Sequence, residues 1–284
     1  MAGDLLCDPP AATDGELALA HDREYIRRIA TGEVDARAMR RIGFPWSPQM
    51  VERSRRSAGA TVAACRDALA VRRAGGAGCS VNLAGGTHHA FADHGEGYCV
   101  FNDAAIAARV VQRESLARRI AIVDLDVHQG NGTAAILADD DTVFTFSMHG
   151  QNNFPFRKQA SDWDIELPDG AGDDEYLSSL GAALPEVFAR ARPELVIYLA
   201  GADPYAGDRL GRLALSKAGL AARDAYVLDS LRAADVPVAV AMAGGYAEDI
   251  EDVVDIHFAT VRAALDRGAM QGRASLARCS PTIP

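Results

Sequence analysis

Five short apolar runs, separated by longer segments with helical periodicity, constrain the fold of this chain more than any other feature. The runs are Cys79–Leu83, Ile120–Leu125, Thr142–Phe146, Leu195–Leu199 and Val236–Met242. Runs of this length that are rich in β-branched residues and bounded by polar or glycine-rich segments are typical of buried parallel strands. Strands that alternate with helices predict an α/β protein with three layers, αβα, around a mostly parallel sheet.

Capping residues and a proline mark the expected helices. Ser47 followed by Pro48 is typical of a helix start, and we expect this helix to continue towards Arg73. The other expected helices are Asp103–Gln112 capped by Asn102, a helix from Gly172 towards Arg190, Lys217–Ala233 capped by Ser216, and Glu248–Leu265. Because the chain has no internal repeat or linker, we expect one domain over residues 1–267 and a loose C-terminal tail over residues 268–284.

Composition excludes several classes of function. The net charge of −10 argues against nucleic-acid binding through a basic surface, and it would tolerate cationic substrates such as lysine side chains or polyamines. No apolar run approaches the roughly 20 residues of a membrane span, and no secretory signal is visible. An odd number of cysteines without a C-x-x-C pair predicts reduced thiols in the cytoplasm. The strong preference for arginine over lysine predicts a GC-rich, bacterial source.

Polar side chains follow the apolar runs at the points where the strands should end. Asp124, Asp126 and His128 alternate after the run that starts at Ile120, so they point to one face. The carboxyl ends of parallel strands share one edge of the sheet, where ligands bind in open α/β folds. Asp and His are ligands of divalent metals, and a catalytic metal with an open position needs a third protein ligand. Asp203, after the fourth run, is the best candidate for that ligand.

The remaining strand ends carry groups suited to proton transfer. His88 and His89 are adjacent in a loop, and imidazoles titrate near neutral pH. Asp124 is free to orient one of them, and Asn131 is placed to hold the other. Tyr246, on a glycine-flanked turn, can donate a hydrogen bond to a carbonyl oxygen on which charge develops. Together these groups predict metal-assisted hydrolysis of an acyl bond.

The same motifs resemble those of a known family. They are Gly85-Gly86-Thr87-His88-His89, Gly97-Tyr98-Cys99-Val100-Phe101-Asn102-Asp103, Asp124–Gly132, Gly201–Asp208 and Gly244-Gly245-Tyr246. The chain resembles the zinc-dependent histone deacetylases, whose superfamily includes acetylpolyamine amidohydrolases and acetoin utilisation proteins. Through Gln129-Gly130-Asn131 it is most similar to class IV enzymes and their bacterial relatives. The resemblance runs from about His21 to about Leu265 and implies an arginase/deacetylase-like fold.

The resemblance also implies a reaction. It implies that an acetyl or longer acyl group is removed from a lysine side chain of a peptide or protein, or from a polyamine, by a water activated by Zn²⁺. The implied Zn²⁺ ligands are Asp126, His128 and Asp203. Fe²⁺ stays an open alternative, because the same ligands bind both ions. His89 would be the general base and acid, and His88 paired with Asp124 would tune the electrostatics. Tyr246 would polarise the scissile carbonyl.

A substrate channel and a second ion are implied as well. Gly97, Tyr98 and a phenylalanine, either Phe154 or Phe156, would wall the channel, with Leu210 near its rim. A structural K⁺ would be held by backbone carbonyls around Asp124, Asp126, His128, Ser147 and Met148.

The chain departs from the family pattern in four places. Asn131 stands where class I members carry Asp, so one histidine has a neutral partner and a less stabilised imidazolium. Tyr98 replaces the usual channel Phe, and the loop Gly43–Trp46 has no acidic residue to grip a substrate backbone. Met1–Ala20 offers no convincing strand, so the sheet is expected to lack an N-terminal edge strand. We therefore expect a version extended upstream to melt at a higher temperature.

Two alternatives stay open besides an acetylpolyamine amidohydrolase. A dinuclear arginase-like ureohydrolase would need extra carboxylates, whereas Gly130 stands two residues after His128. A non-catalytic acyl-group sensor on the same scaffold would be indicated by a lost ligand, histidine or tyrosine, and none is lost. His21, His257 and Asp208 are expected to be structural. The oligomeric state is left open.

Overall fold

The computed structural model describes residues 6–269 and confirms the predicted α/β class. Its centre is a six-stranded sheet in the order β1-β6-β5-β2-β3-β4, in which every neighbouring pair is parallel. The strands are β1 (Cys79–Asn82), β2 (Ile120–Asp124), β3 (Val143–Gly150), β4 (Trp163–Leu167), β5 (Leu195–Leu199) and β6 (Val238–Ala241). Parallel pairing sends all the carboxyl ends to one edge of the sheet, and this positions the site.

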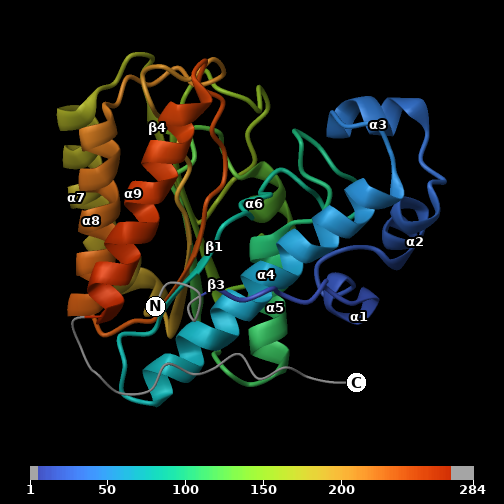
Figure 1. The fold of residues 1–284 in the computed structure, drawn as a ribbon, viewed down its shortest axis with the longest axis horizontal. Coiled ribbons are helices and arrows are strands. Elements are labelled where there is room, and N and C mark those ends of the chain that lie inside the picture. The colour runs from blue at the N-terminus through green and yellow to red at the C-terminus, as the bar shows by residue number, and fades with distance from the viewer. Residues whose placement is uncertain (1–5, 270–284) are drawn as a thin grey trace.

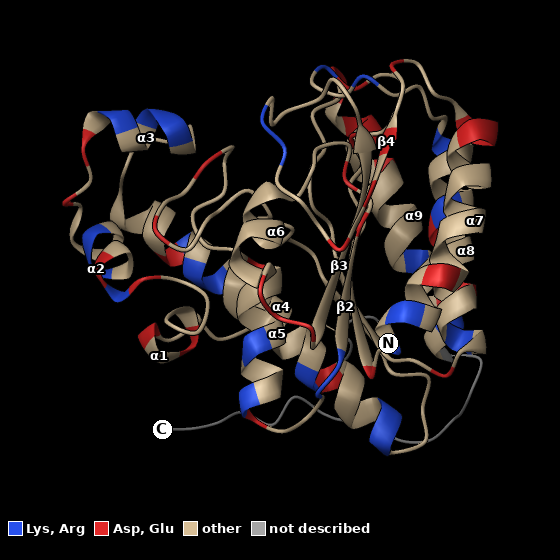
Figure 2. Cartoon of the chain, turned by 180° about the vertical axis from the view of Figure 1, so that it is seen from behind, with Lys and Arg blue, Asp and Glu red and all other residues tan. Residues whose placement is uncertain are grey.

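Helices cover both faces of the sheet (Figure 1). They are α1 (Asp14–Leu17), α2 (Arg23–Thr31), α3 (Ala36–Ile42), α4 (Pro48–Arg73), α5 (Asp103–Arg113), α6 (Asn131–Leu137), α7 (Asp173–Ala191), α8 (Lys217–Ala233) and α9 (Ile250–Ala269). The helices α7, α8 and α9 lie on one face, and α4 and α5 lie on the other, as the reverse view in Figure 2 also shows. The three predicted layers are therefore confirmed, with α2 and α3 near the N-terminal end of α4 and α1 alongside α4 and α5.

The two faces of the sheet contribute to separate hydrophobic clusters. Ile120 and Ile122 of β2 pack with α4 and α5, whereas Ala121 and Val123 pack with α7, α8 and α9. Successive side chains of a strand point to opposite faces. Both faces are buried, and this explains why β2 is apolar at every position before Asp124.

Side-chain caps set the starts of the predicted helices. Ser47 accepts a hydrogen bond from the backbone N–H of Met50 at the start of α4, and Ser216 accepts one from Gly219 at the start of α8. Such caps satisfy backbone donors that have no partner within the helix. The bounds of α4, α8 and β5 agree with the sequence prediction.

One strand was missed. β4 pairs with β3 alone and forms an edge of the sheet. Its polar residues Asp164 and Glu166 alternate with Trp163 and Ile165, so it lacks the continuous apolar run by which the other strands were found. The short helices α1, α3 and α6 were also not predicted, because brief helices depend on tertiary contacts more than on periodicity.

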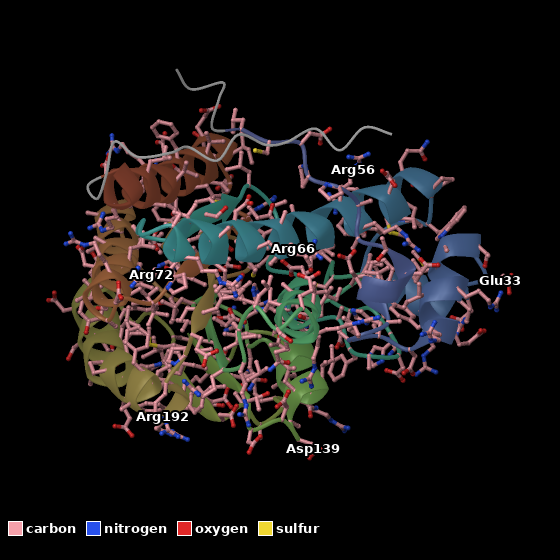
Figure 3. All side chains as sticks on the ribbon, turned by 90° about the horizontal axis from the view of Figure 1, so that it is seen from below. Glu33, Arg56, Arg66, Arg72, Asp139 and Arg192 are labelled. Atoms are coloured by element: carbon pink, nitrogen blue, oxygen red, sulfur yellow. The ribbon has the colours of Figure 1, made fainter. Side chains whose placement is uncertain are left out.

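Ion pairs hold the N-terminal helices against α4. Arg66, labelled in Figure 3, lies 2.9 Å from Glu16 of α1 and 2.5 Å from Glu114 after α5. Between residues 6 and 42 the described chain forms α1, α2 and α3, and β1 is an edge of the sheet. The higher melting temperature of a chain extended upstream stays a prediction.

Three further expectations concern the chain as a whole. The helix α9 includes residues 268 and 269, which were assigned to the loose tail, and residues 270–284 lie outside the described part. Cys65, Cys79 and Cys99 are free thiols, whereas Cys7 is disulfide-bonded, contrary to the prediction that all cysteines are reduced. No helix within residues 6–269 is long and apolar enough to cross a membrane.

Candidate metal centre and active site

Most of the predicted site residues line one cavity of about 580 Å³ at the carboxyl edge of the sheet. They are His88, His89, Gly97, Tyr98, Asp126, His128, Phe154, Phe156, Asp203, Leu210 and Tyr246. Asp124 and Asn131 do not line the cavity; both are buried behind the histidines. The strand-end argument therefore brought the expected side chains to one place, although they come from separate loops.

The deepest group in the cavity is formed by Asp126, His128 and Asp203. Each offers one ligand atom, and these atoms lie within 4.8 Å of one another. His128 Nδ1 is 2.9 Å from Asp126 Oδ1 and 3.2 Å from Asp203 Oδ2. All three side chains are buried, so water does not screen the two carboxylates from each other.

Backbone amides hold the two carboxylates in place. The N–H of Gly244, after β6, donates to Asp126 Oδ2 at 2.8 Å, and the N–H of Val127 donates to Asp203 Oδ1 at 2.9 Å. Asp203 Oδ2 accepts no hydrogen bond from the described residues, although it is buried. A buried carboxylate oxygen without a donor, next to an imidazole nitrogen and a second carboxylate, fits a divalent cation.

The pKa values of Asp203 and His128 are both raised, which shows that the two neighbouring carboxylates lack enough positive charge around them. Burial and the neighbouring Asp126 raise the pKa of Asp203 to about 7. Although burial alone would lower it, the neighbouring carboxylates of Asp126 and Asp203 raise the pKa of His128 to about 10. Two carboxylates that share one buried space repel each other unless a cation lies between them. Asp126, His128 and Asp203 are therefore a suitable ligand set for a metal.

The two adjacent histidines differ in charge because their partners differ. His88 Nδ1 lies 2.7 Å from Asp124 Oδ2; burial lowers the pKa of His88, but Asp124 and Asp126 bring it to about 9. His89 Nδ1 donates to Asn131 Oδ1 at 2.7 Å. Burial and the charges of His88 and His128 lower the pKa of His89 well below its usual range. One ring is therefore cationic and the other is neutral near pH 7.

The backbone of Tyr246 is held by the turn at Asp208. Its backbone N–H donates to Asp208 Oδ2 at 2.5 Å, and Asp208 Oδ1 accepts from the amides of Leu210 and Gly211. Asp208 is thus a turn residue, and it also positions Tyr246. Burial and the negative charges of Asp126 and Asp203 raise the pKa of Tyr246 above its usual range. Its hydroxyl therefore stays protonated and can donate a hydrogen bond.

The cavity wall at Gly97 has no room for a side chain. A Cβ there would lie 2.6 Å from His89 Cδ2 and 3.1 Å from the Phe154 ring, and the φ of +52° favours glycine. Phe154 packs edge-on against His89, whereas Phe156 is 87% exposed. Of the two predicted alternatives, Phe154 therefore forms the wall, and Phe156 lies at the rim with the half-exposed Leu210.

Comparison with known proteins agrees with this geometry. Residues 2–261 match the model of the histone deacetylase domain. The chain belongs to the histone deacetylase family. Members of this family are hydrolases that act on amides, and the fold is the arginase/deacetylase-like fold that the resemblance implied.

Individual relatives share most of this chain. An uncharacterized protein of Picosynechococcus sp. is 48% identical over 88% of this chain and 81% of its own length. Histone deacetylase 2 of Arabidopsis thaliana and a histone deacetylase-like amidohydrolase of Pseudomonas aeruginosa are each 31% identical, and the chain spans 65% of each. The solved structure of the HDA15 HD domain has a TM-score of 0.72 at 22% identity, covering 93% of this chain and 79% of that one.

Sequence reasoning missed Glu96. Asn131 Nδ2 donates to Glu96 Oε2 at 3.3 Å, while Asn131 Oδ1 accepts from His89. The neutral amide therefore bridges an imidazole and a carboxylate, which an Asp at position 131 could not do without a proton. The position of Glu96 next to Gly97 in a family motif was the available signal.

Arg223 was also missed. This side chain of α8 is fully buried and donates through Nη1 to the carbonyls of Leu125 at 3.2 Å and Gly201 at 2.7 Å. Its Nε donates to Asp224 at 2.8 Å. Arg223 thus joins the ends of β2 and β5 directly beside Asp126 and the segment that leads to Asp203. A charged Arg-Asp pair within an apolar helix face was the signal in the sequence.

The implied K⁺ site stays a prediction. Asp124 and Ser147 are direct partners in the register of β2 and β3, so their backbones do lie side by side.

His149 lies on β3 but not in the cavity. The Ser147 hydroxyl lies 2.9 Å from His149 Nδ1. His149 is fully buried and outside the cavity, and burial lowers its pKa to about 4.

Proposed function

We propose that this protein hydrolyses the amide bond of an acylated lysine side chain, or of a related acylated amine, with a zinc ion held by Asp126, His128 and Asp203. The observation that carries the proposal is the buried group of these three ligands at the base of a cavity, beside the neutral imidazole of His89. Relatives named as a histone deacetylase and as a histone deacetylase-like amidohydrolase support it.

The protein's own groups divide the proton transfers between them. When bound, a divalent cation supplies Lewis acidity, which makes a carbonyl more electrophilic and a water more acidic. His89 donates its Nδ1–H to Asn131, so its Nε2 is free to accept a proton from water and return it to the leaving amine. His88, cationic beside Asp124, keeps positive charge near the developing oxyanion. The Tyr246 hydroxyl donates a hydrogen bond to the same oxygen.

The shape of the cavity supports an unbranched amine. A side chain at position 97 would press on His89 and Phe154, so the glycine keeps the space beside these rings open for an unbranched chain such as the methylenes of lysine. Apolar ring faces along that path exclude water from the amide and strengthen the electrostatic interactions there. We also propose that one metal ion suffices, because within residues 6–269 no other group of three ligand side chains lies together.

A substrate panel tests the proposal. Protein reconstituted with Zn²⁺ or Fe²⁺ is assayed with an acetyl-lysine peptide, an acetylpolyamine and a long-chain acyl-lysine peptide. We expect hydrolysis of acyl-lysine, loss of the metal in Asp126→Ala, and a drop in kcat of roughly 10²- to 10³-fold in Tyr246→Phe at full metal content. Stoichiometric metal without turnover of any substrate would favour the acyl-group sensor instead. Failure to bind metal at all would overturn the metal mechanism.

A further inference from the structure

The mouth of the cavity is positively charged although the chain carries a net charge of −10. Three arginines, Arg40, Arg41 and Arg212, line the same cavity as Asp126 and Asp203. Among the described residues, Glu96 is the one lining carboxylate besides these two metal-ligand candidates, and it accepts a hydrogen bond from Asn131. The overall charge had indicated tolerance of cationic substrates, whereas the local charge at the entrance has the opposite sign.

Two of these arginines have no counter-charge within the described part of the chain. The guanidinium groups of Arg40 and Arg41 form no ion pair and no hydrogen bond with residues 6–269, and both residues are exposed. Arg212 is 3.2 Å from Asp169. By contrast, Arg27 on the neighbouring helix α2 pairs with Glu24 and Glu33. The charge at the mouth is therefore available to a ligand.

The arginines are fixed relative to the channel. The backbone N–H of Gly97 donates to the carbonyl of Arg41 at 3.1 Å, and that of Tyr98 donates to Ile42 at 2.7 Å. The C-terminal turn of α3, which carries Arg40 and Arg41, is thus bonded to the channel wall. Figure 2 shows how densely basic residues cover α3. Basic residues at a helix C-terminus also complement the helix dipole, but that effect does not require them to line a cavity.

The direction of the channel decides which part of the substrate meets them. The amide must reach the buried group at the base, so whatever the amine is attached to stays at the mouth. A polyamine would bring protonated amines there, whereas a carboxylate or phosphate would gain charge-assisted hydrogen bonds.

Resting on the proposed function, we propose that Arg40 and Arg41 select substrates with an anionic group on the amine side of the scissile amide. The anion is a carboxylate. It is supplied either by acidic residues that flank an acyl-lysine in a peptide, or by the carboxylate of free acyl-lysine. Each exposed arginine should change affinity for such a substrate by about threefold at low ionic strength, and less in high salt.

Matched substrates and variants test the selection. Acetyl-lysine peptides of one length, flanked by Asp or by Lys, are compared with free acetyl-lysine and an acetylpolyamine on metal-loaded protein. The test variant is Arg40→Ala/Arg41→Ala. Arg37→Ala is the control, because Arg37 lies exposed on the same helix but does not line the cavity. Both variants should melt like the parent protein.

We expect the Asp-flanked peptide to have a KM about tenfold lower than the Lys-flanked peptide at low salt. This preference should shrink in high salt, disappear in the double variant and persist in Arg37→Ala. A preference for free acetyl-lysine over both peptides would identify the small-molecule source of the anion. Equal KM values, a preference for the polyamine, or an unchanged preference in the double variant would overturn the inference.

Binding measurements separate this inference from the proposed function. Fluorescence anisotropy of labelled acetyl-lysine peptides on metal-loaded Tyr246→Phe protein reports the charge preference without turnover. If no substrate is hydrolysed but the Asp-flanked peptide binds more tightly, the proposed function fails and the selection by Arg40 and Arg41 stands. If hydrolysis occurs without a charge preference, the proposed function stands and the selection by Arg40 and Arg41 fails.

Discussion

Replacing Asn131 with Asp tests whether Glu96 dictates an uncharged partner for His89. Asn131 accepts a hydrogen bond from His89 through Oδ1 and donates one to Glu96 through Nδ2. Asp has the same shape but no donor. Asn131→Asp therefore replaces the second hydrogen bond by an approach of two carboxylate oxygens, and we expect the folded state to lose stability wherever both are ionised.

The distance of 3.3 Å between Asn131 Nδ2 and Glu96 Oε2 sets the magnitude. Two unit charges at that distance repel by about 5 kcal/mol at an effective dielectric constant of about 20, and by about 1 kcal/mol in water. Position 131 is 2% exposed and Glu96 is half-buried. We therefore expect Asn131→Asp to lower the free energy of unfolding by about 2 kcal/mol, between these limits.

A double-mutant cycle isolates the repulsion. Urea unfolding is measured in chelator at mildly alkaline pH, so that neither bound metal nor a protonated His89 contributes. The four proteins are the parent, Asn131→Asp, Glu96→Gln and the double variant. In the double variant the amide introduced at position 96 can donate to the carboxylate introduced at position 131, so we expect a coupling energy of about 2 kcal/mol. Additive changes, or an Asn131→Asp protein within about 0.5 kcal/mol of the parent, would refute the reasoning.

Three further predictions follow from other contacts. Gly97→Ala places a Cβ 2.6 Å from His89 at a φ of +52°, so it should abolish turnover while a folded, metal-binding protein persists; normal kcat would contradict this. Arg223→Met leaves Asp224 buried without its cation and should cost about 3–5 kcal/mol in urea unfolding; an unchanged midpoint would show that the pair is dispensable. Burial lowers the pKa of His21 to about 4 from 6.5, so the unfolded chain protonates first as pH falls. Stability present above pH 6.5 should thus be lost towards pH 4, by up to about 3 kcal/mol, and His21→Gln should lose less over this range. Equal pH slopes for the two proteins would argue against it.

Much of the sheet was predictable because its central strands are buried on both faces. Such strands are apolar at every position, so β2 and β5 stand out against their flanks. The edge strand β4 did not, since its first four residues are only partly buried or exposed and its sequence alternates with Asp164 and Glu166. The short helix α1 was missed although Thr13 and Glu16 form a capping box at its start, which is a local signal. Its ion pair between Glu16 and Arg66 joins residues 50 positions apart, and no local pattern predicts that contact.

The candidate metal ligands were predictable for a related reason. Parallel strands deliver their carboxyl ends to one edge, so chain segments that end in Asp126, His128 and Asp203 had to meet there. The hydrogen bonds of His88 and His89 followed from the same argument. Glu96 and Arg223 could not be found in this way, because they lie in a loop and on a helix, where no rule of strand order fixes the neighbour.

The sequence alone determined the fold class, the edge at which the polar residues gather and the kinds of ligand collected there. These depend on periodicity and strand direction, which are local properties of the chain. Only the tertiary structure decided that Asn131 meets Glu96, that Arg223 joins the ends of β2 and β5, and that Arg40 and Arg41 line the entrance. Charge acts through space, so its sign at the cavity mouth depends on which distant segments fold against one another.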